Sequence, residues 1–177
     1  MSSILQNRRF RQLENGETVK SFNCGDTELN DFILKHADDY RKSLLSVSYI
    51  FEEEDTLLAY FTLSNDSLRH ESFNNKSSFN RLNRNINNAK RMREYPAMKI
   101  GRFAISIEYK NKGIGKSILN LIKKTLIEDY PSGCRFITVD AYNNAIEFYQ
   151  KNGFVMVNDF NPERRTQPMF FDLAQLL

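Results

Sequence analysis

The sequence predicts a mixed α/β fold built on one central sheet, and two parts of the chain carry this prediction. Residues 47–51 and 57–63 are short runs rich in aromatic and β-branched residues, separated by an acidic turn, which is typical of an antiparallel hairpin. Residues 98–139 instead have the pattern of a strand, a helix and a second strand. A helix between neighbouring strands requires them to run parallel, so the sheet should be antiparallel at its start and parallel later.

The N-terminal half should contribute one helix and the hairpin. Gly25 supplies a turn and Asp26 or Thr27 a helix cap, and apolar side chains then recur at helical spacing. These are Leu29, Phe32, Ile33, Ala37 and Tyr40. Residues 72–88 are rich in Asn and Ser, and we expect a loop there with about one helical turn.

The C-terminal half should alternate strands and helices. We expect strands at 98–107, 134–139, 154–158 and 169–173, and helices at 113–129 and 144–151. The longer helix ends before Pro131 and Gly133, and its apolar stripe consists of Ile114, Ile118, Leu121, Ile122 and Leu126.

Composition indicates one globular domain spanning residues 1–177, with 41% hydrophobic residues. The sequence contains no apolar run of about twenty residues and no apolar segment near its start, so we expect a cytoplasmic protein without membrane association. Cys24 and Cys134 lack metal-ligand spacing, which favours reduced thiols and no metal site.

The formal charge of +3 says little alone, but basic residues gather in one part of the sequence. This group could attract the phosphates of a phosphorylated ligand or of an RNA substrate, or it could be a solvated loop with scattered charges. Its members are Arg81, Arg84, Lys90, Arg91, Arg93, Lys99 and Arg102.

Two glycines at a strand-to-helix junction, within residues 110–117, point to a phosphorylated ligand. Glycines allow close approach, and the N–H groups at a helix start attract anions. A Walker A motif would need glycine at Lys110, and a dinucleotide fingerprint starting at Gly113 would need glycine at Ile118. Both nucleotide motifs are therefore excluded.

The remaining pattern, a polar residue followed by Gly-x-Gly, resembles the pyrophosphate loop of the GNAT superfamily of N-acetyltransferases. Residues 139–154, with Asn143 before a short helix and Phe148-Tyr149 before Gly153, resemble the second signature of that family. The resemblance covers residues 95–157. It implies a mixed, mostly antiparallel sheet of about six or seven strands with a splayed parallel pair, flanked by about four helices.

The resemblance implies acetyl-coenzyme A as co-substrate, without a metal. The backbone of Phe103, Ala104 and Ile105 would pair with the pantetheine arm, and Asn143 would contact it or simply cap a helix. The pyrophosphate would be held by Lys110, Asn111, Lys112, Gly113, Ile114, Gly115, Lys116 and Ser117. Lys110 stands where the family usually has Gln or Arg.

Tyr149 is the candidate general acid, because a phenol with a pKa of about 10 stays protonated near neutral pH and can protonate the departing thiolate. Alternatively, it is a core residue of a short helix. The sequence offers no clear base for the amine. Glu108 and Asp140 are candidates, although each is more typical of a surface carboxylate.

A looser resemblance of the N-terminal half includes Phe22, Cys24 and Gly25, and it points to the branch of toxins that acetylate aminoacyl-tRNA. The α-amino group of such a substrate has a pKa near neutrality, so a dedicated base is less necessary. The implied partners are an amine acceptor, which could be tRNA, and a small antitoxin protein. An acetyltransferase for a small-molecule or protein amine, and a non-catalytic acyl-coenzyme A binding module, remain open alternatives.

Overall fold

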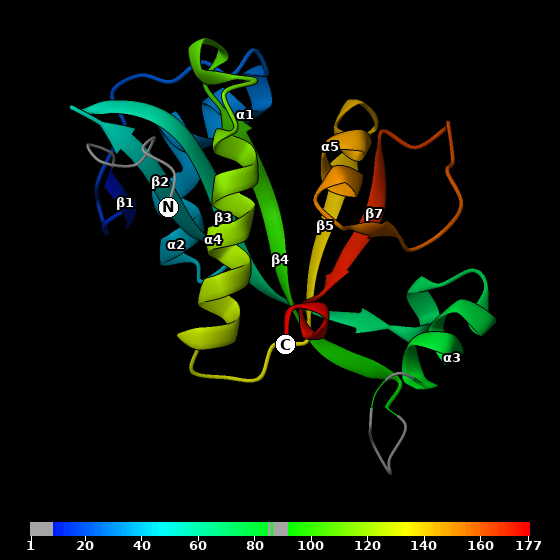
Figure 1. Ribbon diagram of the computed structural model, residues 1–177. Helices are drawn as coiled ribbons and strands as arrows, with labels where there is room; N and C mark the ends of the chain where they lie inside the picture. Colours follow the sequence, from blue (N-terminus) through cyan, green and yellow to red (C-terminus); the bar gives the residue numbers. More distant parts are fainter. Residues whose placement is uncertain (1–8, 85, 87–91) are drawn as a thin grey trace. The chain divides into compact units, whose positions relative to one another are not determined.

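The computed structural model describes residues 9–84, 86 and 92–177, and its strands form a seven-stranded sheet in the order β1-β2-β3-β4-β5-β7-β6 (Figure 1). The sheet is mostly antiparallel with one parallel pair, which confirms the predicted fold class. The strands are β1 (Arg9–Gln12), β2 (Val47–Glu53), β3 (Thr56–Arg69), β4 (Glu94–Ile105), β5 (Phe136–Tyr142), β6 (Val155–Met156) and β7 (Thr166–Asp172).

Four helical segments accompany the sheet in the described part of the chain, besides short 3₁₀ turns. The first is continuous from α1 (Thr27–Asp31) through a π-helical stretch (Phe32–His36) to α2 (Ala37–Lys42). The others are α3 (Lys76–Arg84), α4 (Ile114–Glu128) and α5 (Ile146–Lys151). The chain forms two compact units, which we describe separately.

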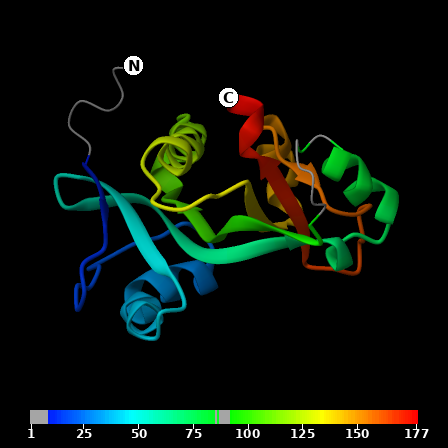
Figure 2. The same ribbon diagram turned by 90° about the horizontal axis from the view of Figure 1, so that it is seen from below.

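Unit 1 comprises residues 9–64 and 100–120 of the described chain. The Asp26 side chain accepts a hydrogen bond from the Leu29 N–H at 3.1 Å, as expected of a helix cap. Phe32 on the same helical segment packs with Phe22 and Tyr60 in a buried core. The strands of this unit separate the helical segment 27–42 from the first turns of α4 (Figure 2).

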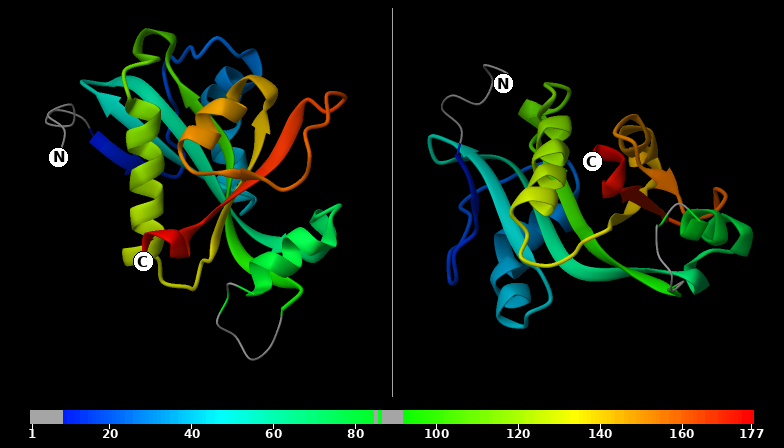
Figure 3. Two further views of the ribbon diagram at one scale, coloured as in Figure 1. Left: turned by 45° about the vertical axis from the view of Figure 1, so that its right-hand side comes forward. Right: turned by 60° about the horizontal axis from the view of Figure 1, so that its bottom comes forward.

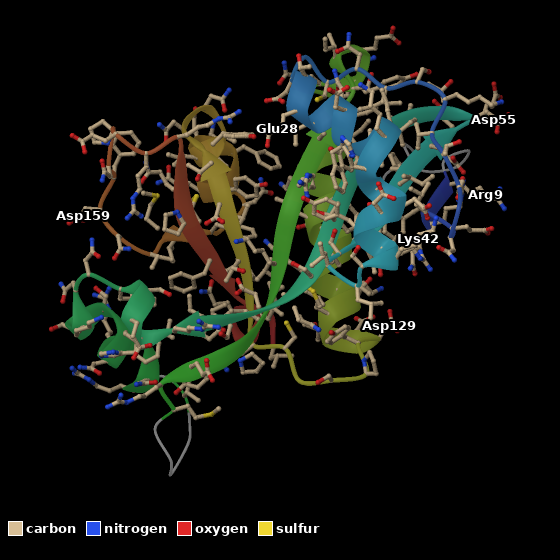
Figure 4. All side chains as sticks on the ribbon, turned by 180° about the vertical axis from the view of Figure 1, so that it is seen from behind. Arg9, Glu28, Lys42, Asp55, Asp129 and Asp159 are labelled. Carbon is tan, nitrogen blue, oxygen red and sulfur yellow. The ribbon has the colours of Figure 1, made fainter. Side chains whose placement is uncertain are left out.

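The predicted hairpin is confirmed, with its turn at Glu54 and Asp55. Both residues have positive φ angles, 46° and 65°, as a two-residue turn that follows the strand twist requires. Asp55 lies at the tip of this hairpin (Figure 4). β1 was not expected from sequence; it adds to the edge of β2, where the Phe10 ring stacks on Tyr49.

Unit 2 comprises residues 65–84, 86, 92–99 and 121–177 of the described chain. β5 and β7 pair in continuous antiparallel register, and α5 covers one face of this pair (Figure 3). The segment expected as a loop contains α3, so that prediction was wrong in extent. Phe79 of α3 is 1% exposed among the rings of Phe73 and Tyr95, and this packing outweighs the weak helix propensity of the segment.

Candidate functional site

The loop that enters α4 presents unpaired backbone N–H groups (green, Figure 1). Asn111 and Gly113 are left-handed, with φ angles of 61° and 78°, and the first N–H to pair within the helix is that of Ser117, with the Gly113 carbonyl at 3.1 Å. The N–H groups of residues 114–116 therefore lack an intrahelical acceptor. No acidic residue lies in the first turn, so the positive end of the helix dipole is uncompensated there and suits an anion.

The space in front of this helix start is open. A Cβ placed on Gly113 would meet nothing within 4 Å, so a ligand can approach the backbone closely. Lys112 and Lys116 are exposed in the same loop and add positive charge, whereas the Ser117 hydroxyl donates to the Gly113 carbonyl at 3.2 Å. This local chemistry is what a pyrophosphate needs.

Lys110 fastens the loop to the segment before α1. Its ammonium donates to the Cys24 carbonyl at 2.7 Å, and the Ile107 N–H donates to the Asn23 carbonyl at 2.9 Å. Gly25 has a φ of 86°, and a Cβ there would lie 3.5 Å from the Ile107 side chain. The Lys110 side chain therefore ties the loop to the Cys24 backbone. The spacing of the sequence motif did not predict this contact.

The end of β4 places Phe103, Ala104 and Ile105 immediately before the loop. Ala104 is buried, whereas Phe103 and Ile105 are half-buried, and the next N–H, of Ser106, bonds the Leu58 carbonyl at 2.8 Å. Pairing of this backbone with a pantetheine arm stays a prediction.

In unit 2, Tyr149 lies on α5 and is only 5% exposed. Its ring contacts Phe148 and Phe154, each at 5.2 Å between centroids. Burial raises the pKa of the Tyr149 phenol, so the group stays protonated well above neutral pH. No residue of the described chain hydrogen-bonds this hydroxyl. The packed ring is what the core interpretation expects, and the role of Tyr149 as general acid stays a prediction.

A buried lysine fixes the end of α5. Lys123 of α4 is 6% exposed, donates to the Asn152 carbonyl at 2.7 Å, and lies 3.7 Å from the Phe171 ring centroid. Burial lowers the pKa of its ammonium. Gly153 then ends the helix at φ 85°, and Phe154 folds back onto Tyr149. The sequence analysis did not predict this contact. The signal that could have indicated it is a lysine that lies beside the apolar stripe of α4.

Asn143 precedes α5, and both ends of its side-chain amide are engaged. Its Nδ2 donates to the Arg164 carbonyl at 2.9 Å, and its Oδ1 accepts from Gln167 Nε2 at 3.2 Å. In this arrangement the amide holds the loop before β7. Its predicted contact with pantetheine stays a prediction.

The candidate bases and the predicted basic group do not form one cluster in the described residues. Asp140 pairs with Lys99 at 2.6 Å, and Glu108 is exposed on a 3₁₀ turn (Ile107–Tyr109). Arg102, expected in the basic group, instead stacks in unit 1 with its guanidinium 3.7 Å from the Phe32 ring centroid. Lys90 and Arg91 of that group lie outside the described residues.

Within the described ranges, Cys24 and Cys134 are free thiols and no cluster of three metal-ligating side chains occurs. In the same part of the chain, no helix is long and apolar enough to cross a bilayer.

Comparison with known proteins identifies a family. The family model for the acetyltransferase (GNAT) domain matches residues 51–167. No curated protein sequence matches this chain.

Solved structures share the fold at low sequence identity. A tyrosine-to-phenylalanine mutant of KacT is 19% identical with a TM-score of 0.76, covering 97% of this chain and 100% of its own. AtaT complexed with acetyl-methionyl-tRNAfMet is 19% identical with a TM-score of 0.72, covering 96% of each chain. A tyrosine-to-phenylalanine mutant of the toxin AtaT, bound to the C-terminus of the antitoxin AtaR and acetyl-CoA, is 20% identical with a TM-score of 0.67 and covers 96% of each chain.

Proposed function

Because this chain belongs to the GNAT acetyltransferase family, we propose that it transfers an acetyl group from acetyl-coenzyme A to a primary amine by direct attack. One observation carries the proposal: the N–H groups of residues 114–116 have no intrahelical partner, and the first turn of α4 holds no acid. This is the local chemistry that binds a pyrophosphate.

The loop residues have different roles in binding the co-substrate. The backbone at Gly113 and Gly115 donates hydrogen bonds to the pyrophosphate, and Lys112 and Lys116 add screened positive charge. Lys110 holds the loop in shape through the Cys24 carbonyl. The backbone of residues 103–105 takes the pantetheine arm as an added strand.

Tyr149 acts as the general acid of the reaction. The amine nitrogen attacks the thioester carbonyl, the new C–N bond forms, and the C–S bond breaks. The phenol gives its proton to the sulfur, and the proton released by the nitrogen restores the phenol through solvent. A raised pKa keeps the phenol protonated before this step.

The α-amino group of an aminoacyl-tRNA is the acceptor we propose. Of the two carboxylates considered as bases, Asp140 is paired with Lys99 and Glu108 is exposed, and an amine with a pKa near neutrality needs no dedicated base. The structure of AtaT with acetyl-methionyl-tRNAfMet supports this choice by similarity of fold. By the same similarity, we propose a small antitoxin as protein partner, supported by the complex of AtaT with AtaR.

Labelled acetyl-coenzyme A, incubated with the protein and a charged tRNA pool, tests the proposal by mass spectrometry. A panel of polyamines and peptides is run in parallel. Label on aminoacyl-tRNA alone supports the proposed acceptor, and label on a polyamine or peptide favours a small-molecule or protein amine. Binding of acetyl-coenzyme A without transfer to any amine would show a non-catalytic binding module.

A further inference from the structure

Lys123 of α4 places an ammonium group in the interior of unit 2, although its neighbours on that face of the helix are apolar. The side chain is 6% exposed, and Ile122 and Leu126 beside it are also buried. No carboxylate of the described chain pairs with the ammonium, which contacts one carbonyl and two aromatic rings. Burying a charge without a counter-ion is costly, and an apolar side chain would avoid the cost. Stability therefore does not explain the lysine.

The ammonium of Lys123 lies at the turn that follows α5. It donates to the Asn152 carbonyl at 2.7 Å, and it lies 3.7 Å from the ring centroid of Phe171 and 5.6 Å from that of Phe154. Carbonyls at the end of a helix lack intrahelical donors and form the negative end of the helix dipole, so a cation is favourable there. The ammonium thus joins the end of α5 to the aromatic core of unit 2.

The same turn holds the backbone of Tyr149. The Tyr149 carbonyl accepts hydrogen bonds from the N–H groups of Asn152 and Phe154, each at 3.0 Å. The Asn152 side chain also donates to the Phe148 carbonyl at 2.8 Å. The residue whose carbonyl receives the Lys123 ammonium is therefore the residue that binds the last turn of α5, where Tyr149 lies.

The ring of Phe154 extends this support to the Tyr149 side chain. The two ring centroids are 5.2 Å apart at an interplanar angle of 68°, which is an edge-to-face contact. Phe154 also lies 5.5 Å from Phe171, the ring closest to the ammonium. Removing the ammonium would therefore loosen both the turn and the ring that hold the phenol. A displacement of about 1 Å at a catalytic group can cost up to about a hundredfold in rate.

We propose that Lys123 is a positioning residue, which holds the Tyr149 hydroxyl where it can protonate the departing thiolate. The inference rests on the proposed function, because it takes Tyr149 as the general acid. Lys123 acts through the turn at residues 152–154 and through the Phe154 ring, and not on the reacting atoms. An apolar side chain of similar length would fill the same space without the hydrogen bond or the charge over the rings.

The variant Lys123→Met tests the proposal, and Lys124→Met, at an exposed neighbouring position, is the control. Steady-state assays use labelled acetyl-coenzyme A and a charged tRNA pool. Lys123→Met should lower kcat about tenfold while the KM for acetyl-coenzyme A stays within about twofold. Its free energy of unfolding at neutral pH should be unchanged or higher, because the buried charge is gone. Lys124→Met should change none of these quantities.

A double variant shows whether Lys123 acts through Tyr149. With phenylalanine at position 149 there is no hydroxyl to hold, so adding Lys123→Met to Tyr149→Phe should not lower kcat further. Losses that multiply in the double variant would overturn the proposal. A Lys123→Met protein that does not fold, or whose kcat falls only with its folded fraction, would overturn it as well, since Lys123 would then be required for folding.

Nuclear Overhauser contacts between the Tyr149 and Phe154 rings give a readout that does not depend on catalysis. The Tyr149 resonances are assigned from their loss in Tyr149→Phe. These contacts should weaken in Lys123→Met and persist in Lys124→Met. Unchanged contacts in Lys123→Met would overturn the positioning proposal, even where the wild type acetylates an amine. If the contacts weaken and the wild type acetylates no amine, the proposed function fails while the positioning of Tyr149 by Lys123 stands.

Discussion

Replacing Gly113 by Asp should lower the affinity for coenzyme A, while the start of α4 should be slightly more stable with Asp than with the uncharged Asn at the same position. The position is suited to this test because a Cβ there would meet nothing within 4 Å, so a side chain fits without displacing neighbours. The φ of 78° is left-handed, which costs about 1 kcal/mol for a residue with a Cβ, and Asn tolerates it best. Gly113→Asn is therefore the matched control, equal in shape and strain but uncharged.

The expected loss of affinity for coenzyme A follows from the added charge alone. A carboxylate about 6 Å from one negative charge of the pyrophosphate, in an effective dielectric constant of about 40, is repelled by about 1.4 kcal/mol, or about tenfold in Kd. Without ligand, the same carboxylate faces the positive end of the helix dipole and should stabilise the fold by about 0.3–1 kcal/mol relative to Asn.

Calorimetric titration with coenzyme A gives the affinities, and urea unfolding of the free proteins gives the stabilities. The difference between Asp and Asn in affinity should shrink at high salt, since the groups are exposed and screened. Equal affinities of the Asp and Asn variants at low salt would refute the assignment of the pyrophosphate to this helix start.

Three further substitutions test unit 2. Tyr149→Phe should lower kcat about ten- to a hundredfold with the KM for acetyl-coenzyme A within about a few fold, in steady-state assays. In urea titrations, the free energy of unfolding of the wild type should rise between neutral and alkaline pH. Lys123→Met should abolish this rise, whereas Lys124→Met, at an exposed position, should retain it. Gly153→Ala should destabilise by about 2 kcal/mol in urea unfolding, because its Cβ would stand 2.9 Å from the Phe171 ring at a φ of 85°.

The sign of the Lys123 effect comes from burial, which lowers the pKa of its ammonium in the folded state. Between that pKa and the ordinary value of 10.5 for lysine, the unfolded chain binds more protons than the folded one. Stability therefore rises with pH in this window. A flat profile in the wild type would show that Lys123 is solvated rather than buried.

A different result for Tyr149→Phe would contradict its role as general acid. Equal losses of kcat and of coenzyme A affinity, together with a lower free energy of unfolding, would show a structural tyrosine. The absence of a hydrogen-bond partner for its hydroxyl among the described residues makes a large loss of stability unexpected.

Several features could be predicted from sequence because they depend on neighbours in the chain. The Asp26 cap, the β2–β3 hairpin and the glycine-rich start of α4 all follow from backbone preferences within a few residues. The Phe148-Tyr149 pair before Gly153 belongs to the same class, since Gly153 supplies the left-handed turn that ends α5.

Other features required contacts between distant segments. The Asn-rich segment forms α3 because Phe79 finds a buried place among rings from β4 and the segment before α3. β1 exists because Phe10 stacks on β2, and Arg102 is a packed cation because Phe32 lies beneath it. Apart from Phe73, which lies six residues before Phe79, these partners are distant in sequence, so local propensity could not predict the contacts.

By itself, the sequence indicated that the start of α4 has unpaired N–H groups and a left-handed glycine, Gly113, because both are local properties of the chain. Only the tertiary structure decided which polar side chains are engaged in hydrogen bonds within the protein. Lys110 is held by Cys24, Asn143 by the loop before β7, and Lys123 by the end of α5. Each of these hydrogen bonds joins groups that folding alone brings together, since a polar group removed from water must find a partner wherever the packing offers one.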